Sequence, residues 1–203
     1  YYQTVNKTTP VAGDVKYVDR NGDGVVDDND RDIIGNPNPD FTYGFQTKVS
    51  WKSLSLSASF NGVQGRDILN VGNRYNNTPG TKSNNVTRKA FQNMWTDENP
   101  SNLYPKSTFV VQNMVMDRYV EDGSYLRCSD ITLSYVLPAK WTNKIGIKNT
   151  SVYASVKNAF VITDYSGYDP EVNSFAFDGL RPGVDMNSYP TPRSFVFGLN
   201  LTF

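Results

Sequence analysis

Hydrophobic and polar residues alternate over the last ten positions of the chain. Phe195, Phe197, Leu199, Leu201 and Phe203 share one parity, and small or polar residues occupy most of the positions between them. A period of two places alternate side chains on opposite faces of a β-strand. The pattern therefore predicts a final strand over residues 194–203.

The same alternation predicts further strands upstream. Residues 41–51 and 54–60 alternate on either side of Lys52, which predicts a hairpin with a tight turn. Residues 148–163 form another alternating segment, and residues 1–6 resemble the end of an earlier strand. The fold class predicted from these segments is all-β and antiparallel.

A strand is also predicted over residues 125–137, with one irregularity. Leu126 and Cys128 hold one parity, whereas Ile131 and the apolar residues after it hold the other. One extra residue in a strand produces this shift, so we expect a β-bulge near Ser129. Cys128 is the only cysteine and is interpreted as a small apolar side chain within the strand.

The connections between the predicted strands alternate in length. The long ones cover residues 14–40, 62–124 and 164–193, and the short ones lie at Lys52 and at residues 138–147. Outer-membrane β-barrels have short turns on the periplasmic side and longer loops outside. The alternation thus predicts a transmembrane barrel with three long extracellular loops, the largest holding a short helix over residues 88–98.

The predicted strands are too few to form a barrel alone. The smallest closed barrels have eight strands, and an open edge in lipid would leave unpaired backbone groups. We therefore expect the chain, which starts at Tyr1 without an initiator Met, to be the C-terminal part of a larger barrel. The polar parity would face the lumen, with these candidates: Gln46, Lys48, Ser50, Ser55, Ser57 and Asn200.

Composition narrows the possible functions. No apolar run approaches the roughly 20 residues of a spanning helix, which excludes the helical route through a membrane. The 20 basic and 20 acidic residues balance, so no nucleic-acid partner is predicted. Histidine, the commonest general base, is absent. Asp169 and Glu171 could form an acid/base pair, but they lie in a proline-containing loop, and we interpret them as loop contacts rather than as part of an enzyme.

The clearest chemical motif is an acidic loop over residues 19–30. Oxygen-bearing side chains occupy loop positions 1, 3, 5, 9 and 12, glycine occupies position 6, and position 7 would offer its backbone carbonyl. These residues form the predicted calcium-ligand set: Asp19, Asn21, Asp23, Val25 (carbonyl), Asp27 and Asp30. Position 12 is an Asp, whose shorter side chain makes bidentate ligation more demanding than the usual Glu.

The segments that flank this loop distinguish a regulatory calcium site from a structural one. A regulatory EF-hand needs flanking helices, whereas residues 15–18 and 33–35 have an extended pattern. We therefore expect a structural calcium ion that stiffens an external loop. The remaining alternative is an acidic surface turn that binds no ion.

Several short sequence blocks follow one another along nearly the whole chain. They cover residues 13–17, 34–37, 39–45, 95–100, 123–127, 131–135, 158–160, 165–171 and 197–203. Among them are Pro39-Asp40-Phe41-Thr42-Tyr43-Gly44-Phe45 and Tyr168-Asp169-Pro170-Glu171. In these blocks and their order the chain resembles the SusC/RagA-like TonB-linked outer-membrane transporters of the Bacteroidetes.

The resemblance implies a barrel of about 22 strands with an N-terminal plug, in the outer membrane of a Gram-negative bacterium. It implies import of glycans or peptides with energy from TonB, and a SusD-like surface lipoprotein over the mouth. The plug and the TonB contact would lie outside this chain. The terminal Phe203 resembles the aromatic residue that outer-membrane assembly recognises.

A protein of a different class could share much of this pattern. A secreted, calcium-stabilised β-sandwich that binds glycans would also combine alternating strands with an acidic loop. Such a module would fold without detergent, whereas a barrel segment would not. The residues that contact a substrate, and the substrate itself, are not identified by the sequence.

Overall fold

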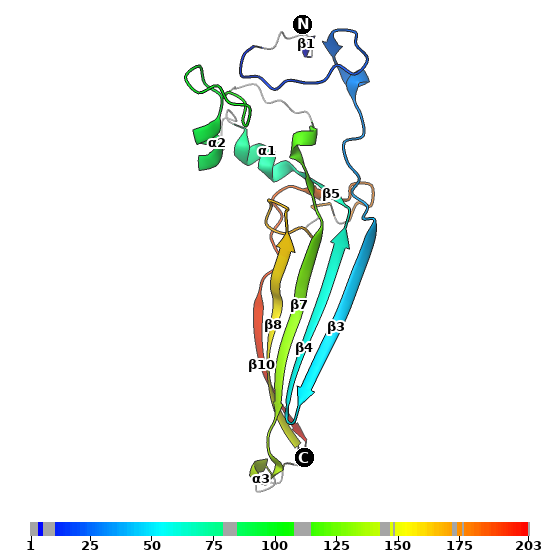
Figure 1. The fold of residues 1–203 in the computed structure, drawn as a ribbon, viewed down its shortest axis with the longest axis vertical. Coiled ribbons are helices and arrows are strands. Elements are labelled where there is room, and N and C mark those ends of the chain that lie inside the picture. The colour runs from blue at the N-terminus through cyan, green and yellow to red at the C-terminus, as the bar shows by residue number, and fades with distance from the viewer. Residues whose placement is uncertain are drawn as a thin grey trace.

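The computed structural model describes residues 4–5, 11–78, 85–107, 115–142, 147, 149–171, 174–175 and 177–202. Five long strands form one antiparallel sheet in the order β10-β8-β7-β4-β3 (Figure 1). They are β3 (Phe41–Trp51), β4 (Leu54–Gln64), β7 (Tyr125–Val136), β8 (Asn149–Thr163) and β10 (Ser194–Thr202). Each long strand pairs with the next one along the chain, as in a meander.

All five predicted strands in the long sheet are confirmed. β4 continues four residues past its predicted end, because residues up to Gln64 still pair with β3. The expected strand at residues 1–6 is only partly described: β1 (Thr4–Val5) pairs in parallel with β2 (Val25–Val26) and not with the long sheet. Phe203 lies outside the described residues.

The predicted bulge is also confirmed. Ser59 pairs with Asp130 while Phe60 pairs with Cys128, so Ser129 is the extra residue of β7. The extra residue brings Cys128 onto the apolar face, where it is completely buried. The neighbouring rings on that face, Phe45 and Phe60, stack with centroids 4.6 Å apart.

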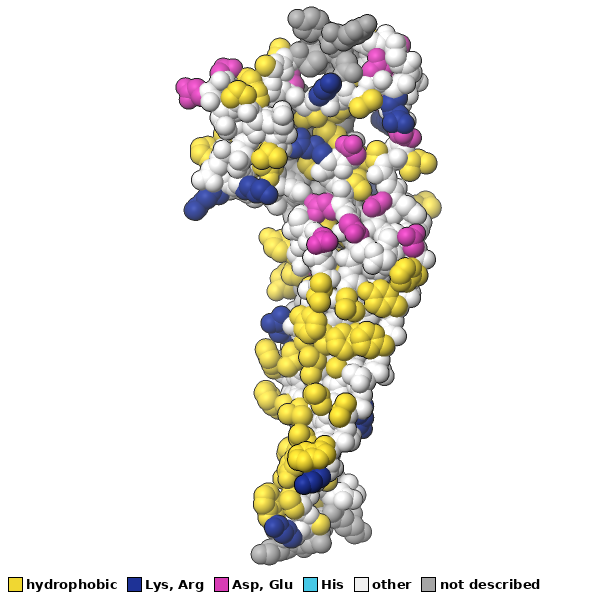
Figure 2. All heavy atoms as spheres, viewed as in Figure 1, with side chains coloured by type: hydrophobic (Ala, Val, Ile, Leu, Met, Phe, Trp, Pro, Cys, Tyr) yellow, Lys and Arg dark blue, Asp and Glu magenta, His cyan; other side chains and the backbone are white. Residues whose placement is uncertain are grey.

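The long sheet has one apolar and one polar face. On the apolar face, large side chains are exposed along the whole length of the strands; Phe197 is 78% and Trp51 69% exposed. Figure 2 shows hydrophobic side chains gathered over the lower two thirds of the molecule. Within the described residues no second layer covers this face, so the sheet lacks the buried core of a soluble sandwich.

The strand register places the polar residues on the opposite face. All six lumen candidates predicted from the sequence share it, since Gln46, Lys48 and Ser50 pair with Ser59, Ser57 and Ser55. Asn200 lies on the same face, because it pairs with Ser151 of that face. Hydrogen bonds along this face include one between Ser50 and Ser55 at 2.8 Å and one from Asn200 to Ser151 at 3.3 Å.

The two ends of the sheet differ. At the turn end, Lys52 adopts a φ of 54° in the turn between β3 and β4, and α3 (Ala139–Thr142) occupies the other short connection. At the loop end lie the three long connections (Figure 1). Within the described residues, no helix has the length and apolar character needed to cross a membrane.

The loop end contains a small fold that the sequence did not predict. A second sheet joins β5 (Asp67–Asn70) to β6 (Val120–Asp122) and β9 (Val184–Asp185). Around it lie α1 (Val71–Asn77), α2 (Arg88–Asn93) and two 3₁₀ turns, η1 (Asp28–Asp30) and η2 (Asp117–Tyr119). The predicted helix over 88–98 is too long, because Met94 leaves the helix to bridge Tyr104.

Candidate functional site

The acidic loop at residues 19–30 is closed by its own carboxylates. Asp19 accepts the backbone N–H groups of Gly22 at 2.7 Å and Gly24 at 2.8 Å. Asp30 accepts those of Arg20 and Asp27, each at 2.8 Å, so the last position reaches back to the second. Backbone donors therefore hold the loop in a compact ring.

The other predicted ligands take part in the same ring. Asp23 accepts from the N–H of Val25 at 2.8 Å, and Asn21 accepts from the N–H of Asp23 at 2.9 Å. Asp27 caps η1 by accepting from the N–H of Asn29. All six predicted calcium ligands thus lie in one loop.

Local conformation agrees with the predicted loop type. Gly24, at position 6, has a φ of +83°, which a residue with a side chain rarely adopts. The described flanks at residues 11–18 and 31–40 contain no helix. These flanks agree with the extended pattern predicted from the sequence for residues 15–18 and 33–35.

The fit of these residues to calcium can be judged from their oxygens. Among the described side chains, no three of Asp, Glu, Cys or His are arranged to hold a metal ion. The carboxylates accept loop amides instead, although each carboxylate has about four lone-pair sites and so keeps some for a cation. Backbone N–H groups, chiefly those of Asp27 and Arg20, hold the pKa of Asp30 below its usual value. The donor chemistry fits calcium, and the ligand set stays a prediction.

A cavity of about 1030 Å³ lies beside this loop. One wall comes from residues 13–34, including Asp27 and Asp30, and the other from residues 95–105 and 115–118, including Trp95 and Tyr104. Burial and the neighbouring Tyr119 raise the pKa of Tyr17, on the cavity wall, to about 12. The Lys106–Asp14 ion pair at 3.2 Å joins the two walls.

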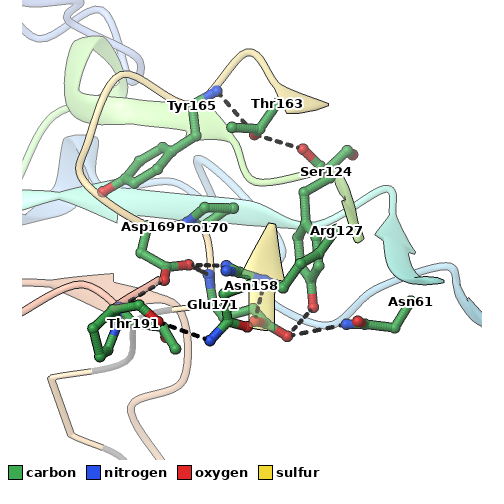
Figure 3. Close-up of polar contacts among 12 residues, drawn as sticks. Asn61, Ser124, Arg127, Asn158, Thr163, Tyr165, Asp169, Pro170, Glu171 and Thr191 are labelled. Atoms are coloured by element: carbon green, nitrogen blue, oxygen red, sulfur yellow. Dashed lines mark hydrogen bonds and ion pairs between the residues drawn. The ribbon is translucent and has the colours of Figure 1, made fainter. Parts of the chain in front are cut away.

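A second polar site lies where the long sheet meets the loops (Figure 3). Arg127 of β7 pairs in register with Asn61 of β4, so both lie on the polar face. Tyr125, two residues earlier, points to the same side. Arg127 is only 5% exposed, and a buried guanidinium requires charged or polar partners.

Those partners come from the connection between β8 and β10. Arg127 Nη2 donates to Asp169 Oδ1, and Asp169 is only 3% exposed. Arg127 Nε lies 2.7 Å from Glu171 Oε2. This nitrogen makes no hydrogen bond, which shows that its N–H is not aligned with the Glu171 oxygen. The second contact is therefore an ion pair without a hydrogen bond. One guanidinium thus contacts two carboxylates.

The two carboxylates have further donors. Glu171 Oε1 accepts from the Tyr125 hydroxyl at 2.6 Å and from Asn61 Nδ2 at 3.3 Å. Asp169 accepts the N–H groups of Glu171 at 2.9 Å and Thr191 at 3.1 Å. Burial opposes ionisation of Asp169, but these donors and Arg127 outweigh it, and its pKa lies below the usual value.

Comparison with known proteins assigns the fold. No protein-family model matches the chain. The TonB-dependent receptor P26 of Formosa agariphila is 35% identical over 201 residues, covering 95% of this chain and 20% of that receptor. The TonB-dependent receptor SusC of Bacteroides thetaiotaomicron is 34% identical over 194 residues, covering 92% of this chain and 17% of SusC.

Solved structures agree with the sequence relatives. The RagAB peptide importer matches in its open-open state with a TM-score of 0.69 and 30% identity, covering 84% of this chain and 18% of that one. Its closed-closed state matches with a TM-score of 0.71, at 28% identity and the same coverage. The chain is SusC/RagA-like. It spans about a fifth of the length of the curated relatives that it matches.

This assignment bears on the carboxylates of the SusC/RagA-like chain. The proteins that it matches are named as receptors and importers. Asp169 and Glu171 both contact Arg127 and several further donors, which confirms that they are loop contacts. The sequence analysis did not identify Arg127 as their partner, although all three lie in blocks that carried the family resemblance.

Proposed function

We propose that the chain is part of the wall and mouth of an outer-membrane active transporter that imports glycans or peptides. The observation that carries this proposal is the long sheet with one exposed apolar face and one polar face. The apolar face would contact lipid, and the polar face would line a water-filled interior. The strands contain 9 to 15 residues, which suits the roughly 9–11 that a spanning strand needs.

Closure of the barrel would come from strands outside this chain. Within the described residues, β3 and β10 are the edge strands of the long sheet. Each unpaired backbone group would cost several kcal/mol in hydrocarbon. Further strands of the same receptor, giving about 22 in all, would pair with both edges. The similarity to the RagA chain of RagAB supports this arrangement.

The energy source and partners follow from the relatives. The curated relatives are TonB-dependent receptors, and we propose that TonB drives this transporter through a plug outside the chain. A SusD-like surface lipoprotein would cover the mouth formed by the loop end. The long loops would then be extracellular, and the turn end periplasmic.

We also propose calcium as a structural ion of the acidic loop, held by Asp19, Asn21, Asp23, Asp27, Asp30 and the carbonyl of Val25. The support is the spacing of the oxygens, the positive φ of Gly24 and the closure of the loop from Asp30 to Arg20. When bound, the ion would neutralise clustered carboxylates. It would stiffen a loop that forms one wall of the cavity.

The soluble β-sandwich is the less favoured alternative. A sandwich buries the apolar face of one sheet against a second sheet. The described small sheet contains strands of only two to four residues and cannot cover the long sheet. Buried residues of the chain, such as Ile68, Tyr119 and Tyr165, lie instead at the loop end.

The test uses the full-length receptor in its own bacterium. Deletion of its gene should abolish uptake of one glycan or peptide class, and a protonophore should abolish that uptake in the wild type. Fractionation should place the receptor in the outer membrane, extractable only with detergent. Recovery of a monomeric, detergent-free protein would instead support the sandwich.

A further inference from the structure

The connection between β8 and β10 folds back over one defined face of the long sheet. Its two ends, residues 164–171 and 183–193, are called the loop arms here. Asn61, Tyr125 and Arg127 all point to the polar face, and all three contact Glu171 or Asp169. The arms therefore lie on the polar side of the sheet, not on the apolar side.

One carboxylate ties both arms to the sheet. Asp169 Oδ1 contacts Arg127 and the N–H of Glu171 in the first arm, while Oδ2 accepts the N–H of Thr191 in the second. The residues that Asp169 joins are 22 positions apart in sequence. Asp169 thus closes the base of the loop, and Arg127 attaches that base to β7.

Other contacts hold the arms to one another and to the small sheet. Tyr165 of the first arm donates to Asp185 of the second at 2.7 Å, and both residues are buried. Arg66 donates to the carbonyl of Pro170 at 2.8 Å. By contrast, Phe177 and Leu180 in the apex are about 90% exposed. The loop is therefore firmly held at its base, whereas these two apex side chains are exposed.

We propose that Arg127 is a positioning residue that fixes the loop arms as an inner lining of the transporter mouth. Because the attachment is a buried ion pair backed by several hydrogen bonds, the arms form a fixed part of the mouth and not a gate that opens. The proposal rests on the proposed function in one respect, namely that the polar face is the lumen side. Asp169 and Glu171 serve as the attachment points, and the arms narrow the passage that a solute can enter.

The experiment uses full-length receptor and three variants: Arg127→Met, the double variant Arg127→Met with Asp169→Asn, and Arg181→Met. Arg181 pairs with Asp178 in the exposed apex of the same loop, so its loss is the matched control. Hydrogen exchange of the detergent-purified receptor reports on peptides containing the amides of Glu171 and Thr191. Wild type and Arg181→Met should both protect these amides.

The two Arg127 variants separate positioning from simple charge balance. Arg127→Met leaves a buried carboxylate without its counter-charge, so it should reach the membrane in reduced amount. The double variant removes that penalty and should recover the amount, yet its arms should still exchange about tenfold or more faster than those of a fourth variant, Asp169→Asn alone, which keeps Arg127. Equal exchange in these two variants would overturn the proposal, since Arg127 would then serve only to balance charge.

A second readout tests the lining itself. Gln46→Cys places a thiol on the polar face, and in cells it should react faster with an external, membrane-impermeant maleimide when combined with the double variant than when alone. Unchanged labelling at equal receptor amount would show that the arms do not narrow the passage. These readouts need no substrate: if the wild type fails to support uptake, the proposed function fails, whereas a loss of the difference between variants overturns only this inference.

Discussion

The acidic loop at residues 19–30 and the loop arms at residues 164–171 and 183–193 both hold carboxylates at the same end of the sheet, in different surroundings. In the arms, Asp169 and Glu171 share the guanidinium of Arg127, which is buried between strand and loop. In the acidic loop, Asp19 and Asp30 accept only backbone N–H groups in the contacts described. The ion pair Arg31–Asp28, formed at the end of that loop, is strongly exposed.

This difference explains what each region needs in order to be ordered. The arms have a counter-charge in Arg127, so residues of this chain can hold them in place without a bound ion. The acidic loop places five carboxylates within twelve residues with no buried cation among the described residues, so an external cation would complete it. Disrupting each region in turn should therefore have different consequences.

The largest expected effect comes from removing a partner of the buried ion pair. Asp169→Ala would leave Arg127 buried without its closest counter-charge, and breaking such a pair costs about 3–5 kcal/mol. We expect a clear fall in the melting temperature of the detergent-purified full-length receptor. Removal of the exposed apex pair by Asp178→Ala should cost about 0–1 kcal/mol. Equal effects of the two substitutions would contradict the ranking.

The next effect is that of calcium on the acidic loop. If the ion binds the folded loop alone, calcium at 100 times its Kd should stabilise that loop by about 2.7 kcal/mol. Titration calorimetry and protease resistance of the receptor, in calcium and in chelator, measure this. Asp19→Asn together with Asp30→Asn should weaken binding by about tenfold or more, since affinity depends on ligand charge.

Asp28→Asn is the matched control for the calcium experiment. Asp28 lies in the same loop but outside the predicted ligand set, and its side chain is 86% exposed. It should bind calcium almost as wild type does. A wild-type receptor that gives no calcium-dependent heat or protection would remove the structural ion from the proposal.

The third effect is a dependence of the arms on pH. The pKa of Asp169 is below its unfolded value of 3.8, so its stabilising contribution is present above that value. The contribution falls as pH drops through the folded pKa, because protonation weakens the pairing with Arg127. Protection factors in the arms, corrected for the intrinsic pH dependence of amide exchange, should therefore fall below about pH 4, and the fall should be much smaller in Asp169→Asn. The same fall in that variant would assign the effect to other groups.

The long sheet was predictable because its signal is local. Alternation over seven or more residues identifies each strand, and the parity change between Cys128 and Ile131 identified the bulge. The small sheet was missed because β5, β6 and β9 have two to four residues, too few to show a period. The helix α1 was missed because Val71–Asn77 has no apolar periodicity, and its start depends on the Asn70 cap.

The candidate sites differ in the same way. The acidic loop lies within twelve consecutive residues, so spacing alone suggests its chemistry. The Arg127–Asp169 contact joins residues 42 positions apart, and no short-range pattern connects them. From the sequence, Asp169 and Glu171 could be an acid/base pair or loop contacts, and only the fold shows that both contact Arg127.

The smallest expected effect tests the backbone of the acidic loop without touching its charges. At Gly24 a Cβ would meet no atom within 4 Å, but its φ of +83° disfavours any side chain. Gly24→Ala should therefore destabilise the loop by about 1–2 kcal/mol through strain alone. Gly179, in the apex of the other loop, has equal space and no positive φ. Gly179→Ala should leave stability unchanged or raise it slightly. Protease resistance of the acidic loop with calcium present measures the first change, and an unaffected Gly24→Ala loop would show that its ring closes without this conformation.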